Sequence, residues 1–159
     1  MLTDADKRDI VRSWRLVVPI AETAAELFYK RLFELKPEYV ELFPADMSGQ
    51  RRKLVTMLSF IVKSLDWMQE DWEEEIDPED DLALVVLAMG RRHASLYKIP
   101  DESYDFVGAA LIWTLEQGLG DAFTPDLQDS WTRLYKLLAT TMKIGGRSAR
   151  VEMDLGRVA

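Results

Sequence analysis

The stretch LALVVLAMGRRHASLY, residues 82–97, is the most apolar part of the chain and contains its only histidine. At helical spacing, His93 falls in line with Val85, Met89 and Leu96. The spacing predicts a helix from about Leu82 to Tyr97 that carries one imidazole toward the core. A histidine on such a face usually hydrogen-bonds to a backbone carbonyl, and it can also bind a metal.

The segments on either side of this stretch have helical periodicity, and none alternates in the manner of a strand. Capping residues, prolines and glycines place helices from Thr3 to about Val18, Pro19 to Pro37, Ser48 to about Leu65, about Asp101 to Leu119, and about Pro125 to Lys143. Gly145 and Gly146 are expected to end the last helix. The sequence therefore predicts an all-α fold with one domain over residues 1–145 and a flexible C-terminal tail over residues 146–159.

Composition narrows the functional class. The chain has 159 residues, 48% of them hydrophobic, which suits one domain with a single core. It has no cysteine and one histidine, so disulfides, thiolate metal sites and sites with two imidazoles are excluded. A net charge of −8 disfavours nucleic acid and anionic membranes as partners. We find neither a signal peptide nor a membrane-spanning run and expect a cytoplasmic protein.

Acidic residues crowd the segment before the histidine helix. Between Asp66 and Asp81, ten of sixteen residues are acidic, and Pro78 interrupts any helix there. Like charges repel one another, so we expect an extended, solvated loop rather than a cation site.

Two polar side chains interrupt the apolar faces of other predicted helices. Tyr29 lies within the apolar face of the second helix, and Gln50 shares a stripe with Leu54. Either group can be satisfied by the backbone or by solvent. Together with His93, however, they form the set that a haem pocket needs, with an imidazole for iron on one side and two donors opposite. A donor aimed at bound dioxygen stabilises it by roughly 1–3 kcal/mol.

The order and spacing of several motifs resemble the single-domain bacterial globins and the haem domain of flavohaemoglobins. The matching segments are Leu27 to Phe33 followed by Pro37 and Leu42-Phe43, then Gln50 to Leu54, Gly90 to His93, Tyr104 to Leu115, and Trp131 with Tyr135. The resemblance covers residues 3 to 143 and implies the globin fold, a helical sandwich around a haem pocket.

The resemblance also implies a role for each matched position. It makes His93 the axial ligand of a haem b iron, Tyr29 and Gln50 the distal donors, and it places Phe43, Leu54, Met89, Val107 and Tyr104 around the haem. One departure concerns a glutamate that flavohaemoglobins place near the proximal imidazole. Its position falls at Gly146 here, which argues against strong activation of bound dioxygen.

The resemblance implies a bacterial oxygen-binding or oxygen-transport globin whose ligands are dioxygen and other diatomic gases, NO and CO among them. One alternative is a nitric oxide dioxygenase or peroxidase-like enzyme served by an external reductase. The other is a gas or redox sensor that acts through an interaction surface. The expected assembly is a monomer or a homodimer.

Overall fold

The computed structural model describes the backbone of residues 2–67, 86, 93 and 100–158. Within the two long segments, side chains are described for residues 2–65 and 100–147. The elements are α1 (Asp4–Val17), η1 (Val18–Ile20), α2 (Ala21–Leu35), η2 (Pro37–Leu42), α3 (Ser48–Trp67), α5 (Ser103–Leu119), η3 (Gly120–Ala122) and α6 (Pro125–Val158). Every element in these ranges is a helix, so the all-α prediction is confirmed.

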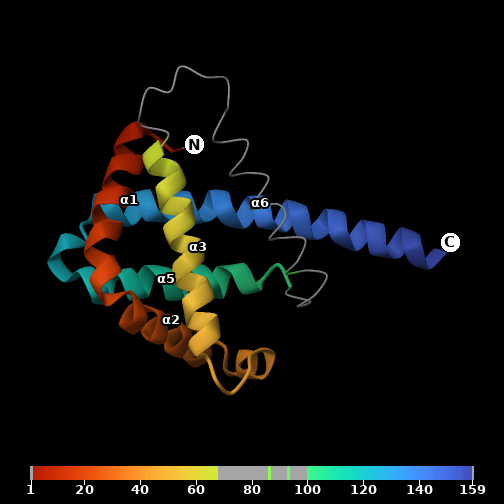
Figure 1. Cartoon of the computed structure of the whole chain (residues 1–159). Coiled ribbons are helices and arrows are strands. Elements are labelled where there is room, and N and C mark those ends of the chain that lie inside the picture. The colour runs from red at the N-terminus through yellow and green to blue at the C-terminus, as the bar shows by residue number, and fades with distance from the viewer. Residues whose placement is uncertain (1, 68–85, 87–92, 94–99, 159) are drawn as a thin grey trace.

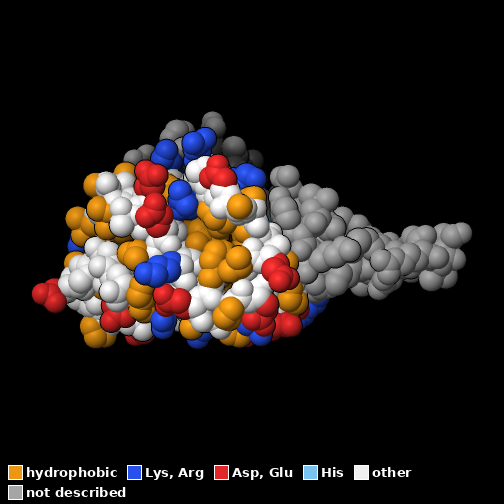
Figure 2. All heavy atoms as spheres, turned by 90° about the horizontal axis from the view of Figure 1, so that it is seen from below, with side chains coloured by type: hydrophobic (Ala, Val, Ile, Leu, Met, Phe, Trp, Pro, Cys, Tyr) orange, Lys and Arg blue, Asp and Glu red, His pale blue; other side chains and the backbone are white. Residues whose placement is uncertain are grey.

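The helices pack in crossing layers (Figure 1). Helix α5 packs on α2 and α6, while α1 contacts α3 and α6. Helix α3 crosses in front of α5 and α6 in the view of Figure 1. None of the described helices is both long and apolar enough to cross a membrane. Seen from the side of α2 and η2, acidic and basic side chains are interspersed among apolar ones, so that face has no continuous basic surface (Figure 2).

The first helix begins where its cap predicts. The Thr3 backbone N–H donates to the Asp6 carboxylate at 3.0 Å, and the Asp6 N–H donates to the Thr3 hydroxyl at 3.1 Å. This is a reciprocal capping box. Pro19 lies in the short η1 turn rather than at the start of α2. Helix α2 ends at Leu35, just before the Lys36-Pro37 pair, as the steric restriction on the residue before a proline predicts.

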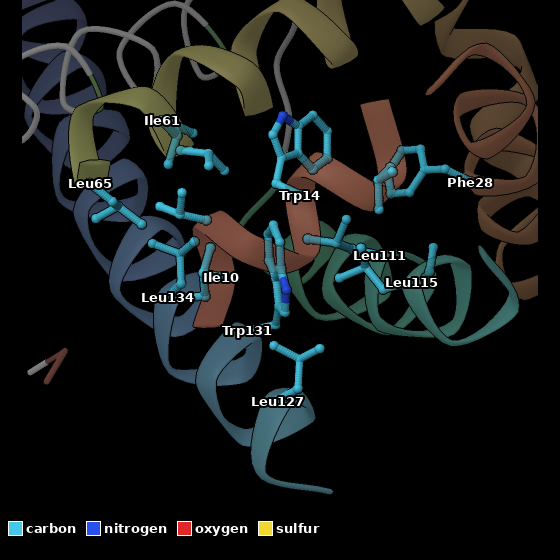
Figure 3. Packing of buried hydrophobic residues seen from close by; sticks show 14 of the residues in the cluster. Ile10, Trp14, Phe28, Ile61, Leu65, Leu111, Leu115, Leu127, Trp131 and Leu134 are labelled. Carbon is cyan, nitrogen blue, oxygen red and sulfur yellow. The ribbon is translucent and has the colours of Figure 1, made fainter. Parts of the chain in front are cut away.

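Two tryptophans join α1 to α6 in the core (Figure 3). The rings of Trp14 and Trp131 are tilted, with their centroids 6.2 Å apart. The Trp131 indole N–H donates to the Ser13 hydroxyl at 2.9 Å, and that hydroxyl donates to the Ile10 carbonyl at 2.8 Å. The Trp131 indole and the Ser13 hydroxyl therefore both have hydrogen-bond partners, which allows the large ring of Trp131 to be almost fully buried.

A buried carboxylate links the same two helices. Asp6 accepts hydrogen bonds from the Arg133 guanidinium at 2.6 Å and from the Ser130 hydroxyl at 2.7 Å. The Arg133 hydrogen bond is the largest influence on the Asp6 carboxyl and holds its pKa well below the usual range, against the opposing effect of burial. Asp6 therefore caps α1 and anchors it to α6.

The last helix differs from the prediction. Helix α6 continues through Gly145 and Gly146 to Val158. A helix-ending glycine adopts positive φ, and among the described glycines only Gly120, after α5, does so. Gly145 and Gly146 are buried within the helix, and just beyond them Arg147 pairs with Asp101 at 3.5 Å. The predicted helix end was therefore wrong. The division into a domain over residues 1–145 and a mobile tail over residues 146–159 stays a prediction.

The predicted histidine helix and most of the acidic segment lie outside the described residues. Within that region the structure describes Val86 and His93, and both are helical. Val86 is almost completely buried, as is typical of a residue in so apolar a segment.

Candidate functional site

The structure brings Tyr29 and Gln50 together from two different helices. Tyr29 lies on α2 and is 7% exposed, while Gln50 lies half-buried in the first turn of α3. Burial raises the pKa of the Tyr29 phenol, and a hydrogen bond with the Gln50 side chain acts in the opposite direction. The phenol is therefore neutral at physiological pH and retains the proton that it needs to act as a donor.

Aromatic rings surround Tyr29. The Phe28 ring meets it edge to face at a centroid distance of 4.9 Å, and the Phe43 ring does so at 5.5 Å. The ring centroids of Phe33 and Phe43 lie 5.6 Å apart, so Phe33 belongs to the same group of aromatic rings. Such contacts restrict ring rotation and keep water away from the phenol. Phe28 and Phe33 were not predicted as site residues, although Phe33 follows Tyr29 by four residues, a spacing that places the two on one helix face.

Phe43 directly follows η2 and has an extended backbone. A contact between η2 and α5, two elements far apart in the sequence, holds this part of the chain in place. The Tyr39 hydroxyl lies 2.9 Å from the Ser103 hydroxyl on α5, and both residues are buried. The Tyr39 ring also meets Phe106 edge to face at 6.0 Å. Tyr39 and Ser103 were not predicted as site residues, because no local signal links positions so far apart in the chain.

Leu54 and Val107 are half-buried and pack against the central hydrophobic cluster. Leu54 also lines a partly open cavity of about 30 Å³, together with Phe28, Leu58 and Leu111. The Thr114 hydroxyl at the cavity wall donates to the Ala110 carbonyl at 2.7 Å and is therefore satisfied. A cavity with apolar walls and no unsatisfied polar group offers little to hold water.

The predicted proximal side is described only in part. His93 is helical and half-buried, whereas Met89 lies outside the described residues. Tyr104 is 8% exposed on α5, and its carbonyl accepts a hydrogen bond from the Tyr135 hydroxyl. The position of Gly146 within α6 is buried and carries no carboxylate. The roles of His93, Met89 and Tyr104 around a cofactor stay predictions.

The residues present fit haem. A chain with one histidine and no cysteine supplies few of the nitrogen and sulfur ligands from which proteins build a transition-metal site. One imidazole is enough, however, for iron that porphyrin nitrogens already hold. In addition, the Arg51 Nε at the start of α3 is buried without a hydrogen-bond partner in the described part of the chain. A haem carboxylate is an acceptor of the kind that this donor lacks.

The described structure is thus an all-α fold in which a buried phenol and a half-buried amide from two different helices meet beside aromatic rings. The family model named Globin matches residues 26–142. The chain therefore belongs to the globin family, and haem-based binding of diatomic gases is its class of function.

Individual relatives support the same assignment. Neuroglobin of Tetraodon nigroviridis is 26% identical over 147 residues, which span 91% of this chain and 92% of that protein. The flavohemoprotein of Bacillus subtilis is 27% identical over 74% of this chain and 27% of its own length. The flavohemoprotein of Chromobacterium violaceum is 31% identical over 72% of this chain and 26% of its own length. The chain thus matches nearly all of a neuroglobin but about a quarter of a flavohemoprotein.

Proposed function

We propose that the chain is a haem b globin that reversibly binds dioxygen, and also NO and CO, with His93 as the axial ligand of the iron. The observation that carries this proposal is the pairing of Tyr29 with Gln50 inside the group of rings that Phe28 and Phe43 complete. The haem, when bound, supplies the iron at which the gas binds.

The chain's own residues then determine how long the gas stays. The neutral Tyr29 phenol and the Gln50 amide donate hydrogen bonds to a gas that carries partial negative charge. Each bond of this charged type contributes about 1.5–3 kcal/mol. Phe43, Leu54 and Val107 exclude water, which would otherwise compete for both donors. His93 would hold the iron, since it is the only imidazole in the sequence.

The visible spectrum of the purified chain, reconstituted with hemin and then reduced with dithionite, tests this proposal. We expect a haem spectrum that changes when CO or dioxygen is added. His93→Gly should lose the iron–imidazole spectrum, and added free imidazole should restore it, because the substitution leaves a space of that shape. A wild-type chain that takes up no hemin would refute the proposal, as would a His93→Gly spectrum identical to that of the wild type.

A second candidate is turnover of nitric oxide by the oxygenated protein, with a separate reductase that re-reduces the iron. The similarity to flavohemoproteins favours it. The buried Gly146 argues against it, because the resemblance places a glutamate there in the enzymes. Catalytic nitric oxide consumption with an added flavin reductase would support this activity, whereas a single stoichiometric turnover would exclude it.

A further inference from the structure

Helix α3 carries a basic stripe on its outer side. Residues 48–65 contain four basic residues and no acidic one, although the whole chain has 28 acids against 20 bases. Five exposed residues follow one another along a single side of the helix at helical spacing. We call them the α3 stripe: Arg52, Lys53, Thr56, Phe60 and Lys63.

The buried side of α3 points the other way. Ile61 and Val62 are each 3% exposed and Leu65 is 1% exposed, so these residues hold the helix on the core. Helix α3 crosses in front of α5 and α6, and neither of these helices covers its outer side (Figure 1). The α3 stripe is therefore open to another molecule.

The charges of the α3 stripe are not neutralised by described neighbours. None of its three bases forms an ion pair in the part of the chain that the structure describes, whereas Lys36, for example, pairs with Glu38 at 2.9 Å. The fields of unpaired bases along one helix side add together and attract an anionic group.

Phe60 gives the α3 stripe an apolar contact. It is 44% exposed, and it is the only aromatic residue among the large apolar side chains that are exposed in the described segments. Lys53 lies about two helical turns before it and Lys63 about one turn after it. An aromatic ring between bases is complementary to a segment that carries an apolar residue between acids.

The length of the α3 stripe limits what can bind there. At 1.5 Å per residue, Arg52 and Lys63 lie about 16 Å apart along the helix axis. An extended segment of about five residues spans that distance. A stable interface between two folded proteins takes roughly 20–30 residues from each side. The α3 stripe therefore suits a short linear segment better than a whole folded surface.

Charge narrows the choice further. A membrane surface or a nucleic acid is an extended anion, and it would also meet the acids that give this chain its net charge of −8. A short segment stays close to the bases of the stripe, and charges more than about 8 Å away are screened at physiological salt. We propose that the α3 stripe binds a short acidic segment of a partner protein, with an apolar residue of that segment against Phe60.

A synthetic heptapeptide, with a central leucine between two runs of three glutamates, is the probe. Fluorescence anisotropy of the labelled peptide, titrated with the full-length protein, measures its dissociation constant. We expect binding that weakens as salt is added. Lys53→Glu combined with Lys63→Glu should raise the dissociation constant at least about tenfold, because two attractions become repulsions. Phe60→Ala should raise it at least about threefold.

Matched controls separate the stripe from net charge. Lys30→Glu combined with Lys136→Glu changes the net charge equally at two exposed lysines outside the stripe, on α2 and α6, and should change the dissociation constant less than about twofold. A peptide with glutamines in place of the glutamates should not bind. Lys53→Gln combined with Lys63→Gln is the milder variant and should weaken binding in the same direction. Circular dichroism shows whether each variant keeps its helices.

Three results would overturn the proposal. The first is a wild-type chain that does not bind the acidic peptide at protein concentrations up to about 1 mM. The second is an equal loss of binding in the stripe variants and in the control pair. The third is tighter binding of phosphatidylserine vesicles or duplex DNA than of the peptide, which would assign the stripe to a membrane or a nucleic acid. These measurements do not depend on haem, so their outcome is independent of the proposed function.

Discussion

The hydroxyl groups of Tyr39 and Ser103 lie 2.9 Å apart, although the two residues are 64 positions apart in the chain. This contact fastens η2 to the first turn of α5. Phe43 directly follows η2, and Val107 lies one turn further along α5. The Tyr39–Ser103 hydrogen bond thus joins the two segments that carry Phe43 and Val107, two residues predicted to line the haem pocket.

Removal of the Tyr39 hydroxyl should destabilise the protein. Tyr39→Phe leaves the buried Ser103 hydroxyl unpaired, and we expect the free energy of unfolding in urea to fall by about 1–3 kcal/mol. Ser103→Ala and the double variant complete a thermodynamic cycle. The free energy of unfolding of the double variant should fall by less than the sum of the decreases in the two single variants. Strict additivity would show that the two hydroxyls do not stabilise one another.

The distal pair should control the release of dioxygen. Tyr29→Phe removes a donor to the bound gas, and we expect the dissociation rate measured by stopped flow to rise roughly 10- to 100-fold. Gln50→Leu should act in the same direction. Tyr135→Phe, which removes a phenol oxygen that donates to the Tyr104 carbonyl, is the matched control and should change the rate little. Unchanged rates in both distal variants would remove the pair from the mechanism.

The rate of dioxygen dissociation should depend little on pH. Because burial raises the pKa of Tyr29 above its usual value of 10.0, the phenol stays protonated up to at least about pH 9. We therefore expect a flat profile of dioxygen dissociation between about pH 6 and pH 9. A rate that rises steeply over that interval would show that the donor loses its proton there.

Gly108 on α5 lies directly against the ring of Tyr135 on α6. A Cβ at this position would come within 2.5 Å of the Tyr135 Cε1 and 2.9 Å of its Cδ1. Gly108→Ala should therefore displace the Tyr135 ring and lower stability by about 1–3 kcal/mol. In Gly49→Ala the new methyl group meets nothing within 4 Å, so this helix variant should be neutral or slightly stabilised. Equal melting temperatures for the two variants would contradict the tight packing at Gly108.

The Asp6–Arg133 pair should make stability depend on pH. The folded state holds the pKa of Asp6 below its usual 3.8, so the contribution to stability is complete above that value and is lost as the pH falls below it. Asp6→Asn should therefore be less stable than the wild type at pH 7, and the difference should shrink below about pH 4. Glu22→Gln, at an exposed acid on α2, is the control. If the stability difference between Asp6→Asn and the wild type stayed constant from pH 7 to about pH 3, the Asp6–Arg133 pair would not be the source of the pH dependence.

The sequence predicted most of the helices because the relevant signals are local. The Thr3–Asp6 capping box and the proline at position 37 act within three or four residues, and each produced the boundary that it predicts. The periodicity of α2 and α3 likewise placed Tyr29 and Gln50 on inward faces. That placement required only the repeat of a helix, and not knowledge of which helices pack together.

The sequence by itself therefore determined the helical class, the globin family and the candidate donors, because these follow from short-range pattern and from the order of motifs. Only the tertiary structure decided that Tyr39 reaches Ser103, that Asp6 reaches Arg133, and that α6 continues through Gly145 and Gly146. Contacts between residues far apart in the chain depend on how whole helices pack, and packing against neighbours can outweigh a local signal such as a pair of glycines.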